Sequence, residues 1–278
     1  MTGGPLATGR SPGRLFAPER MIWTVHRELA LLLGAGRALL LQIAHPLVAA
    51  GVAEHSDFAR DPFGRLFRTL APMYSLVFGS PEEAEAAGAG LARAHARVHG
   101  VLREPVGPFP AGTPYDARDP ELRLWVHATL IDTSLLVYTR FVRPLPPPAA
   151  AGYYADSREL ARCLDVPDSL TPPTLEAFQG YVAGVLASDA LAVGPGTREL
   201  ARSIFRPPGS RTLRALAPLV EFLTVGLLPP RLRQMYGYPW TSARESGLRA
   251  VAGAVRRVLP LLPSRLRVAP HARKAERS

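Results

Sequence analysis

The chain has 278 residues, of which 47% are hydrophobic and 20% are charged, and its formal net charge is +10. This length and apolar content are sufficient for a packed core and exclude a disordered chain. The single cysteine, Cys163, excludes a disulfide framework and a zinc or iron–sulfur site built on cysteines. A lone thiol suits a reducing compartment, so we expect a cytoplasmic protein.

The positive charge is concentrated near the C-terminus. Residues 244–278 contain nine Lys or Arg and two Asp or Glu, which gives +7, so residues 1–243 carry only +3. That body has no basic stripe with interleaved stacking aromatics, and we therefore expect no nucleic-acid partner. The tail, residues 244–278, is expected to form a basic amphipathic helix suited to a membrane surface or a partner.

The N-terminal part begins with residues 1–19, which are rich in Gly and Pro and are expected to form a flexible arm without a secretory signal. The first long apolar stretch, Leu29–Ala53, has the length of a membrane span. Arg37, Gln42 and the pair His45-Pro46 interrupt it, and a charge near the centre of a lone span is costly. We therefore interpret this stretch as buried helices, broken at His45-Pro46.

The remaining chain shows mostly helical spacing. Ser80-Pro81-Glu82-Glu83 is a typical helix start, and Gly100 is the expected end of that helix. Further helices are predicted over residues 119–142, about 150–164, from Ser169 or Thr171 to Ala187, and over 213–228. Strand signals are nearly absent. The sequence predicts an all-α protein with one domain over residues 20–243, preceded by the arm and followed by the tail.

Common enzyme motifs are missing from the sequence, including dinucleotide and P-loop glycine patterns, zinc-protease helices and nucleophile elbows. Paired carboxylates on apolar helices are also missing, which argues against a di-iron bundle. The candidates for chemistry are therefore polar residues inside apolar helices. These are Arg37, His45, His55, Arg65, Arg68, Thr69, His95, His99, His127 and Asp132.

His95 shares a helix face with Leu91, Val98 and Leu102, which predicts a buried side chain. Burial disfavours the imidazolium, so a neutral ring is available as a ligand for a metal or a haem iron. The alternative is a core histidine hydrogen-bonded to a backbone carbonyl.

Arg65, Arg68 and Thr69 lie at positions i, i+3 and i+4, so they share one helix face. Guanidinium and hydroxyl groups together suit an anionic group. The alternative is a solvated face that pairs with Asp57 or Asp61.

Arg37 has apolar neighbours on both sides, so a buried guanidinium there needs an acid or an anionic ligand, and Asp132 is a candidate partner. For His45, His55 and His127 we favour structural roles: a helix break, a helix end and a satisfied buried side chain.

These residues occur in strings that resemble the catalytic domain of rubber oxygenases (latex-clearing proteins) and mycophenolic-acid oxygenases. The resemblance covers about residues 22–240, and its most specific part is 34–69. The matching strings are Gly34-x-Gly36-Arg37-Ala38-Leu39-Leu40-Leu41-Gln42, His45-Pro46-Leu47-Val48-Ala49-Ala50-Gly51-Val52, His55-Ser56-x-Phe58, Asp61-Pro62, Arg65-x-x-x-Thr69, His95-Ala96-Arg97-Val98-x-Gly100, Tyr115-Asp116, Trp125-Val126-His127-Ala128-Thr129-Leu130, and Leu228-Pro229-Pro230 with Tyr236-Gly237-x-Pro239-Trp240.

The resemblance implies an all-helical fold that buries a b-type haem. It implies that His95 ligates the iron, with Arg65 and Thr69 beside the distal pocket. The position of a lysine that caps the iron in some members holds Arg68, which stays protonated and should not ligate. Arg37 and His99 are the further residues that we expect near the cofactor.

Two positions depart from the family pattern. His99 stands where members carry an arginine four residues after the axial histidine. The glutamate proposed as the base for rubber cleavage has no match, because an alanine of the Pro46–Ala53 helix takes its place. The resemblance therefore supports haem binding but does not extend to polyisoprene cleavage.

From these observations we expect a haem-dependent oxygenase that uses dioxygen and acts on a hydrophobic small molecule. Two other classes stay open. One is a non-catalytic helical protein that binds haem or an apolar ligand, and the other is a peripheral membrane protein that docks through its tail.

Overall fold

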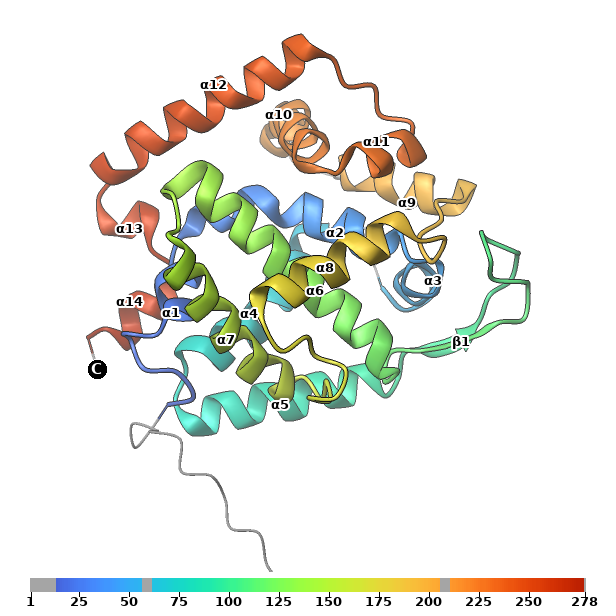
Figure 1. Cartoon of the computed structure of the whole chain (residues 1–278), viewed down its shortest axis with the longest axis horizontal. Helices are drawn as coiled ribbons and strands as arrows, with labels where there is room; N and C mark the ends of the chain where they lie inside the picture. The colour runs from blue at the N-terminus through green and yellow to red at the C-terminus, as the bar shows by residue number, and fades with distance from the viewer. Residues whose placement is uncertain (1–13, 57–61, 206–210, 278) are drawn as a thin grey trace, which may run out of the picture.

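The computed structural model describes residues 14–56, 62–205 and 211–277 (Figure 1). Regular structure in these residues is almost entirely helical, which confirms the predicted all-α class. The exception is one two-stranded antiparallel sheet. In chain order the elements are α1 (Met21–His26), the 3-10 helix η1 (Leu29–Gly34), α2 (Ala35–Ile43), α3 (Pro46–His55), α4 (Pro62–Phe78), α5 (Pro81–His95), β1 (His99–Val101), β2 (Pro114–Asp116), α6 (Pro120–Val137), the π-helix η2 (Tyr138–Val142), α7 (Pro147–Cys163), α8 (Leu175–Ala187), α9 (Pro195–Ile204), α10 (Arg211–Leu227), α11 (Pro230–Tyr236), α12 (Ser242–Val258), the 3-10 helix η3 (Leu259–Leu261), α13 (Ser264–Arg267) and α14 (Pro270–Ala275).

Helix α6 lies in the middle of the molecule, with α10 and α12 on one side and α5 on the other (Figure 1). It packs against η1, α2, α7 and α8. Residues on every face of it are buried, which is why its sequence is apolar all round and lacks a polar stripe. The Asp119 carboxylate caps its first turn, 2.8 Å from the backbone nitrogen of Glu121. The long helix predicted from residue 119 is therefore confirmed, with η2 completing it to Val142.

The apolar stretch from Leu29 forms η1, α2 and α3, and the break predicted at His45-Pro46 is confirmed. Pro46 opens α3 while His45 has extended backbone angles. No single helix among the described residues has the length and apolar character of a membrane span. Only the pair Leu29–Ile43 and Pro46–His55 meets both criteria together, and it is bent by 109°.

Gly34 at the end of η1 and Gly36 of α2 bring the start of α2 close to its neighbours. A Cβ atom on Gly34 would lie 2.5 Å from the Thr133 side chain, and one on Gly36 would lie 2.1 Å from that of Thr224. Only glycine permits these approaches of α2 to α6 and α10. The glycines of the Gly34-x-Gly36-Arg37 string are therefore explained by packing.

Arg37 is buried at the junction that these glycines create. Its guanidinium donates to the Asp132 carboxylate at 2.6 Å, to the Thr133 hydroxyl at 2.5 Å and to the Leu227 carbonyl at 2.8 Å. The ion pair predicted between Arg37 and Asp132 is confirmed. It links α2, α6 and α10.

Helix α5 begins as predicted, with a capping box between Ser80 and Glu83, but it ends at His95 and not at Gly100. The chain from His99 to Val101 instead pairs with Pro114–Asp116. A Cβ atom on Gly100 would lie 2.6 Å from the Tyr115 hydroxyl oxygen, so the strand pairing requires a glycine there. Pairing with a distant segment thus overrides the local helical spacing.

Helix α8 starts later than predicted. Thr174, and neither Ser169 nor Thr171, accepts the capping hydrogen bond, from the backbone nitrogen of Ala177 at 3.2 Å. Pro172 and Pro173 follow Thr171 directly, and a proline pushes the residue before it out of helical geometry. The helix can begin only beyond this pair.

Parts of the expected arm and tail belong to the core. Phe16 is 1% exposed and packs in the cluster that contains Trp23. Val268 and Ala272 belong to the same cluster, and Leu248 of α12 is buried against α10. Residues 1–13 of the expected arm lie outside the described residues. From residue 14 onward, the two ends of the chain pack together.

Two buried histidines lie between α1, α6 and α7. The Nε2 atom of His26 is 3.0 Å from the Tyr153 hydroxyl, and that of His127 is 3.0 Å from the Ser157 carbonyl. This contact supports the structural role favoured for His127 in part, because its buried Nδ1 atom has no hydrogen bond in the described structure. Burial is the main cause that lowers the pKa of each ring to about 4. The charge of His127 lowers the pKa of His26 further, whereas the hydrogen bond to Ser157 opposes the shift at His127.

These two histidines should make stability depend on pH. An unfolded histidine has a pKa near 6.5, so between about pH 6.5 and pH 4 the unfolded chain binds more protons than the folded one. The free energy of unfolding should therefore be highest above about pH 6.5 and should fall as the pH drops toward 4. Urea unfolding at a series of pH values measures this slope, and His127→Gln should flatten it. An equal change of slope in His55→Gln, at an exposed position, would contradict the assignment.

The Arg37–Asp132 pair should contribute strongly to stability. Asp132→Ala leaves the buried guanidinium without its carboxylate, and we expect a loss of about 3 kcal/mol or more in the free energy of unfolding. The matched control is Asp168→Ala, which removes the exposed partner of Arg162 and should cost less than about 1 kcal/mol. Urea denaturation of both variants measures these losses. Equal losses in the free energy of unfolding for Asp132→Ala and Asp168→Ala would show that the Arg37–Asp132 pair contributes no more than an exposed pair.

Candidate functional site

His95 is the last residue of α5 and is half-buried, on the same side of the helix as Leu91. Burial is the first cause that lowers its pKa, the nearby Arg123 guanidinium adds to this, and Asp165 opposes it. The ring is therefore neutral at neutral pH. Within the described part of the chain, neither ring nitrogen has a hydrogen bond. The alternative prediction, that His95 is hydrogen-bonded to a backbone carbonyl, is therefore wrong for the described structure.

The charged groups beside His95 come from α6 and from the end of α7. The Arg123 side chain is 11% exposed, and it lies 3.2 Å from the Asp165 carboxylate and 3.0 Å from the Ala117 carbonyl. Asp165 has a left-handed backbone (φ 55°) just after α7, where the backbone nitrogen of Val166 returns to the Ala161 carbonyl at 3.0 Å. This helix-ending turn fixes the carboxylate beside Arg123.

Sequence reasoning did not identify Arg123 and Asp165. Both are distant from His95 in the chain, and neither lies in a local pattern that marks a site. Only the tertiary fold brings the charges of Arg123 and Asp165 close enough to act on His95.

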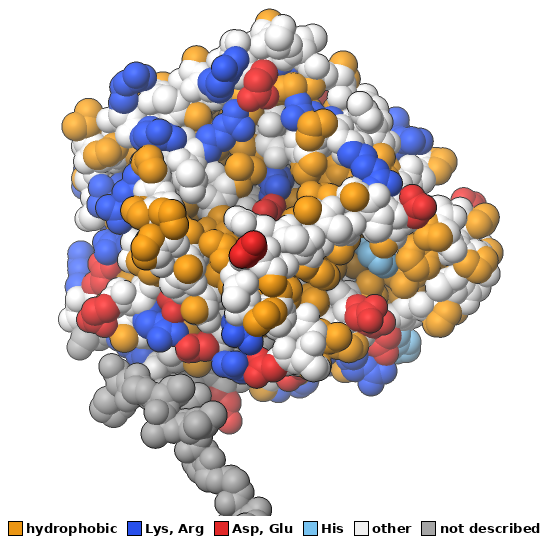
Figure 2. All heavy atoms as spheres, in the orientation of Figure 1, with side chains coloured by type: hydrophobic (Ala, Val, Ile, Leu, Met, Phe, Trp, Pro, Cys, Tyr) orange, Lys and Arg blue, Asp and Glu red, His pale blue; other side chains and the backbone are white. Residues whose placement is uncertain are grey.

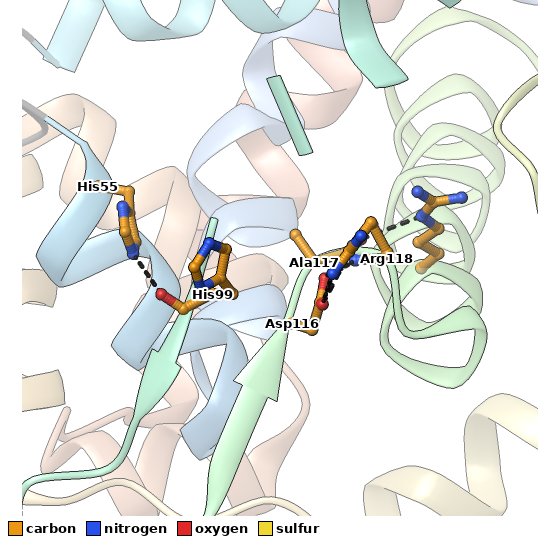
Figure 3. Close-up of polar contacts among 6 residues, drawn as sticks. His55, His99, Asp116, Ala117 and Arg118 are labelled. Carbon is orange, nitrogen blue, oxygen red and sulfur yellow. Dashed lines mark hydrogen bonds and ion pairs between the residues drawn. The ribbon is translucent and has the colours of Figure 1, made fainter. Parts of the chain in front are cut away.

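His99 lies on β1, beside His95 in the chain but on a different element. The hairpin places it between His55 on one side and Asp116 on the other (Figure 3). The His55 ring donates from Nε2 to the His99 carbonyl at 3.2 Å. Hydrogen bonds from Arg118, more than the charge of His99, lower the pKa of Asp116 to about 2. The exposed His99 ring therefore faces a carboxylate that is already paired.

Arg65, Arg68 and Thr69 all lie on α4, as the predicted helix face requires. The side chains of Arg68 and Thr69 are exposed, whereas the side chain of Arg65 lies outside the described part of the structure. Asp57 and Asp61, the alternative partners of this face, also lie outside it.

Helices α4 and α5 are joined by only two residues, Gly79 and Ser80, and pack against each other, so they run in opposite directions. The first half of α4 therefore lies at the same end of the pair as the last turn of α5. Arg65, Arg68 and Thr69 therefore lie at the same end of the α4–α5 helix pair as His95.

The contacts of Arg37 do not place it at the end of the molecule that carries His95. Each of its guanidinium nitrogens has a protein partner on α6 or at the end of α10. Its burial is thus explained without a cofactor.

Two further polar residues, Glu54 and His45, lie near the hairpin of β1 and β2. Glu54 of α3 accepts hydrogen bonds from the Tyr115 hydroxyl at 2.5 Å and from Arg103 at 2.8 Å, and the bond from Tyr115 is the main cause that lowers its pKa. Glu54 is therefore ionised and links α3 to β2.

His45 has a buried Nδ1 atom without a hydrogen bond in the described chain, and burial lowers its pKa to about 4. Like His95, it is a neutral histidine with a ring nitrogen that has no hydrogen bond in the described chain, and it therefore serves as a control for His95.

The described residues contain no group of three or more His, Cys, Asp or Glu side chains that could hold a metal ion. A haem iron makes a smaller demand on the protein, because the porphyrin supplies four nitrogen ligands and one histidine completes the proximal side.

Comparison with known proteins gives a family match over most of the chain. Residues 23–257 match the family described as "ER-bound oxygenase mpaB/B'/Rubber oxygenase, catalytic domain". The chain is also similar to an uncharacterised protein of Mycobacterium bovis and to one of Mycobacterium tuberculosis. Each is 28% identical over 236 residues, which cover 82% of this chain and 88% of the relative. No solved structure matches. The family expected from the sequence is therefore confirmed: this chain belongs to the mpaB and rubber oxygenase catalytic-domain family.

Proposed function

We propose that this protein is a haem-dependent oxygenase that acts on a hydrophobic small molecule. Membership of an oxygenase family supports the general activity. The observation that carries the finer proposal is His95, a neutral, half-buried imidazole without a hydrogen bond in the described structure, at the position that the resemblance marks as the iron ligand.

The residues at this end of the molecule fit a haem in their chemistry. Ligation needs an imidazole nitrogen that is neither protonated nor engaged, and His95 meets both conditions. Haem b also carries two propionates, which suit cationic partners. Arg68 on α4 is an exposed cation, and His99 on β1 is an exposed ring at the same end.

When bound, the haem supplies an iron centre at which dioxygen is activated. In the proposed arrangement His95 holds the iron. Arg65 and Thr69 donate hydrogen bonds that orient dioxygen or the oxidised substrate, because a guanidinium stays charged and a hydroxyl can both donate and accept. Arg68 remains protonated and therefore does not compete with His95 as a ligand.

Asp165 and Arg123 have a proposed supporting role. A carboxylate near a ligating histidine can select the ring tautomer and the ring orientation. Asp165 is the acid whose charge acts on His95, and Arg123 holds that carboxylate in place at 3.2 Å. Both residues are therefore proposed to position the His95 ring.

The proposed substrate is apolar because the inward face of α5 that leads to His95 offers no hydrogen-bonding side chains. It consists of Ala84, Ala87, Gly88 and Leu91. Polyisoprene cleavage is not part of the proposal, since the base that the family uses for it has no match on α3.

The proposal is tested by the absorption spectrum of the purified protein after haem supplementation. We expect a Soret band that is lost or strongly shifted in His95→Ala, because the iron loses its protein ligand. This readout reports the cofactor itself and does not require the substrate to be known.

Two matched variants serve as controls. His99→Ala removes the neighbouring histidine on β1, and His45→Ala removes another neutral histidine that has a ring nitrogen without a hydrogen bond in the described structure. Both should keep the wild-type Soret band. A wild-type protein without a Soret band, or a loss in His45→Ala equal to that in His95→Ala, would refute the proposal.

A further inference from the structure

Three large apolar side chains project into solvent at the turn between α12 and α13. Val258 is 51% exposed, Leu261 is 82% exposed and Leu266 is 57% exposed. Pro260 and Pro263, also exposed, restrict the backbone between them. We call residues 256–267 the apolar turn. Leu259 within the turn and Val268 directly after it are buried, so the exposed side chains project from a packed base.

All the Lys, Arg, Asp and Glu residues in and around the apolar turn are basic ones. Residues 246–275 contain seven Lys or Arg and no Asp or Glu. Arg257 and Arg265 lie on either side of Leu261, and neither has an acidic partner among the described residues. Figure 2 shows basic and hydrophobic side chains side by side along the edge of the molecule where Figure 1 places α12 and α13.

The apolar turn is held firmly at both ends. At its first residue, Arg256 donates to the Thr139 and Arg140 carbonyls at 2.9 Å each. After it, the backbone nitrogen of Ala269 donates to the Arg27 carbonyl at 2.7 Å. The turn is thus presented in one conformation, and little conformational entropy is lost when it binds.

We propose that the apolar turn docks on the surface of an anionic phospholipid bilayer. The leucines enter the interface between headgroups and acyl chains, and Arg257 and Arg265 remain at the phosphates. The shape of the turn favours a bilayer over a protein partner. Its apolar side chains are each more than half exposed, and a fluid interface can close around each of them.

This inference is independent of the haem. Leu261 and Leu266 lie beyond residue 257, where the family match ends, so membership of the family does not account for them. Deleting residues 244–278 would not test it, because Leu248, Val268 and Ala272 are buried and their removal would open the core. Point variants in the full-length chain are required.

The test is co-sedimentation of the full-length protein with vesicles of phosphatidylcholine alone or mixed with phosphatidylserine. The wild type should bind only the mixed vesicles, and the binding should weaken as salt is added. The variant Leu261→Glu with Leu266→Glu should bind about tenfold more weakly or worse, because two interfacial leucines are lost. Arg257→Glu should weaken binding by about fivefold or more.

The matched control is Leu170→Glu, which changes an exposed leucine between α7 and α8 and should leave vesicle binding unchanged. All these positions are exposed, so circular dichroism should confirm intact folding. No binding of the wild type to mixed vesicles, equal binding to both vesicle types, or wild-type binding by the double leucine variant would overturn the proposal.

Discussion

Helix α6 is enclosed by its neighbours along its length, and its polar side chains therefore depend on partners within the protein. Asp132 and Thr133 receive hydrogen bonds from Arg37. The Trp125 ring donates to the Leu41 carbonyl at 3.2 Å, and His127 contacts the Ser157 carbonyl. Each of these bonds fixes one neighbouring helix against α6. The orientation of α2 and α7 follows from them.

The candidate site is attached to the same helix, α6. Arg123 lies in the first turns of α6, and its guanidinium is held by the Ala117 carbonyl and by Asp165. The charged pair beside His95 is thus anchored to a helix that has buried residues on every face. The apolar turn is likewise backed by buried residues, so both proposed functional regions stand on packed elements.

Much of the fold follows from local sequence signals. The capping box at Ser80, the break at His45-Pro46 and the buried ion pair of Arg37 with Asp132 are all confirmed. These features depend on short-range chemistry or on the high cost of burying a charge alone. They can be predicted because no distant segment competes with them.

The rest depends on contacts that no local pattern shows. The end of α5 is set by strand pairing with Tyr115, and the start of α8 is set by two prolines whose effect outweighs the caps before them. Arg123 and Asp165 act on His95 only because the tertiary fold brings these distant parts of the chain together. The exposure of Leu261 was not predictable either, because the helical period of α12 ends before it.

The central claim is that His95 ligates a haem, and chemical rescue tests it most directly. A haem-supplemented His95→Gly variant should regain the wild-type absorption spectrum when imidazole is added, because the free ligand then replaces the missing side chain. A His95→Gly variant whose spectrum already equals that of the wild type before imidazole is added would contradict the claim.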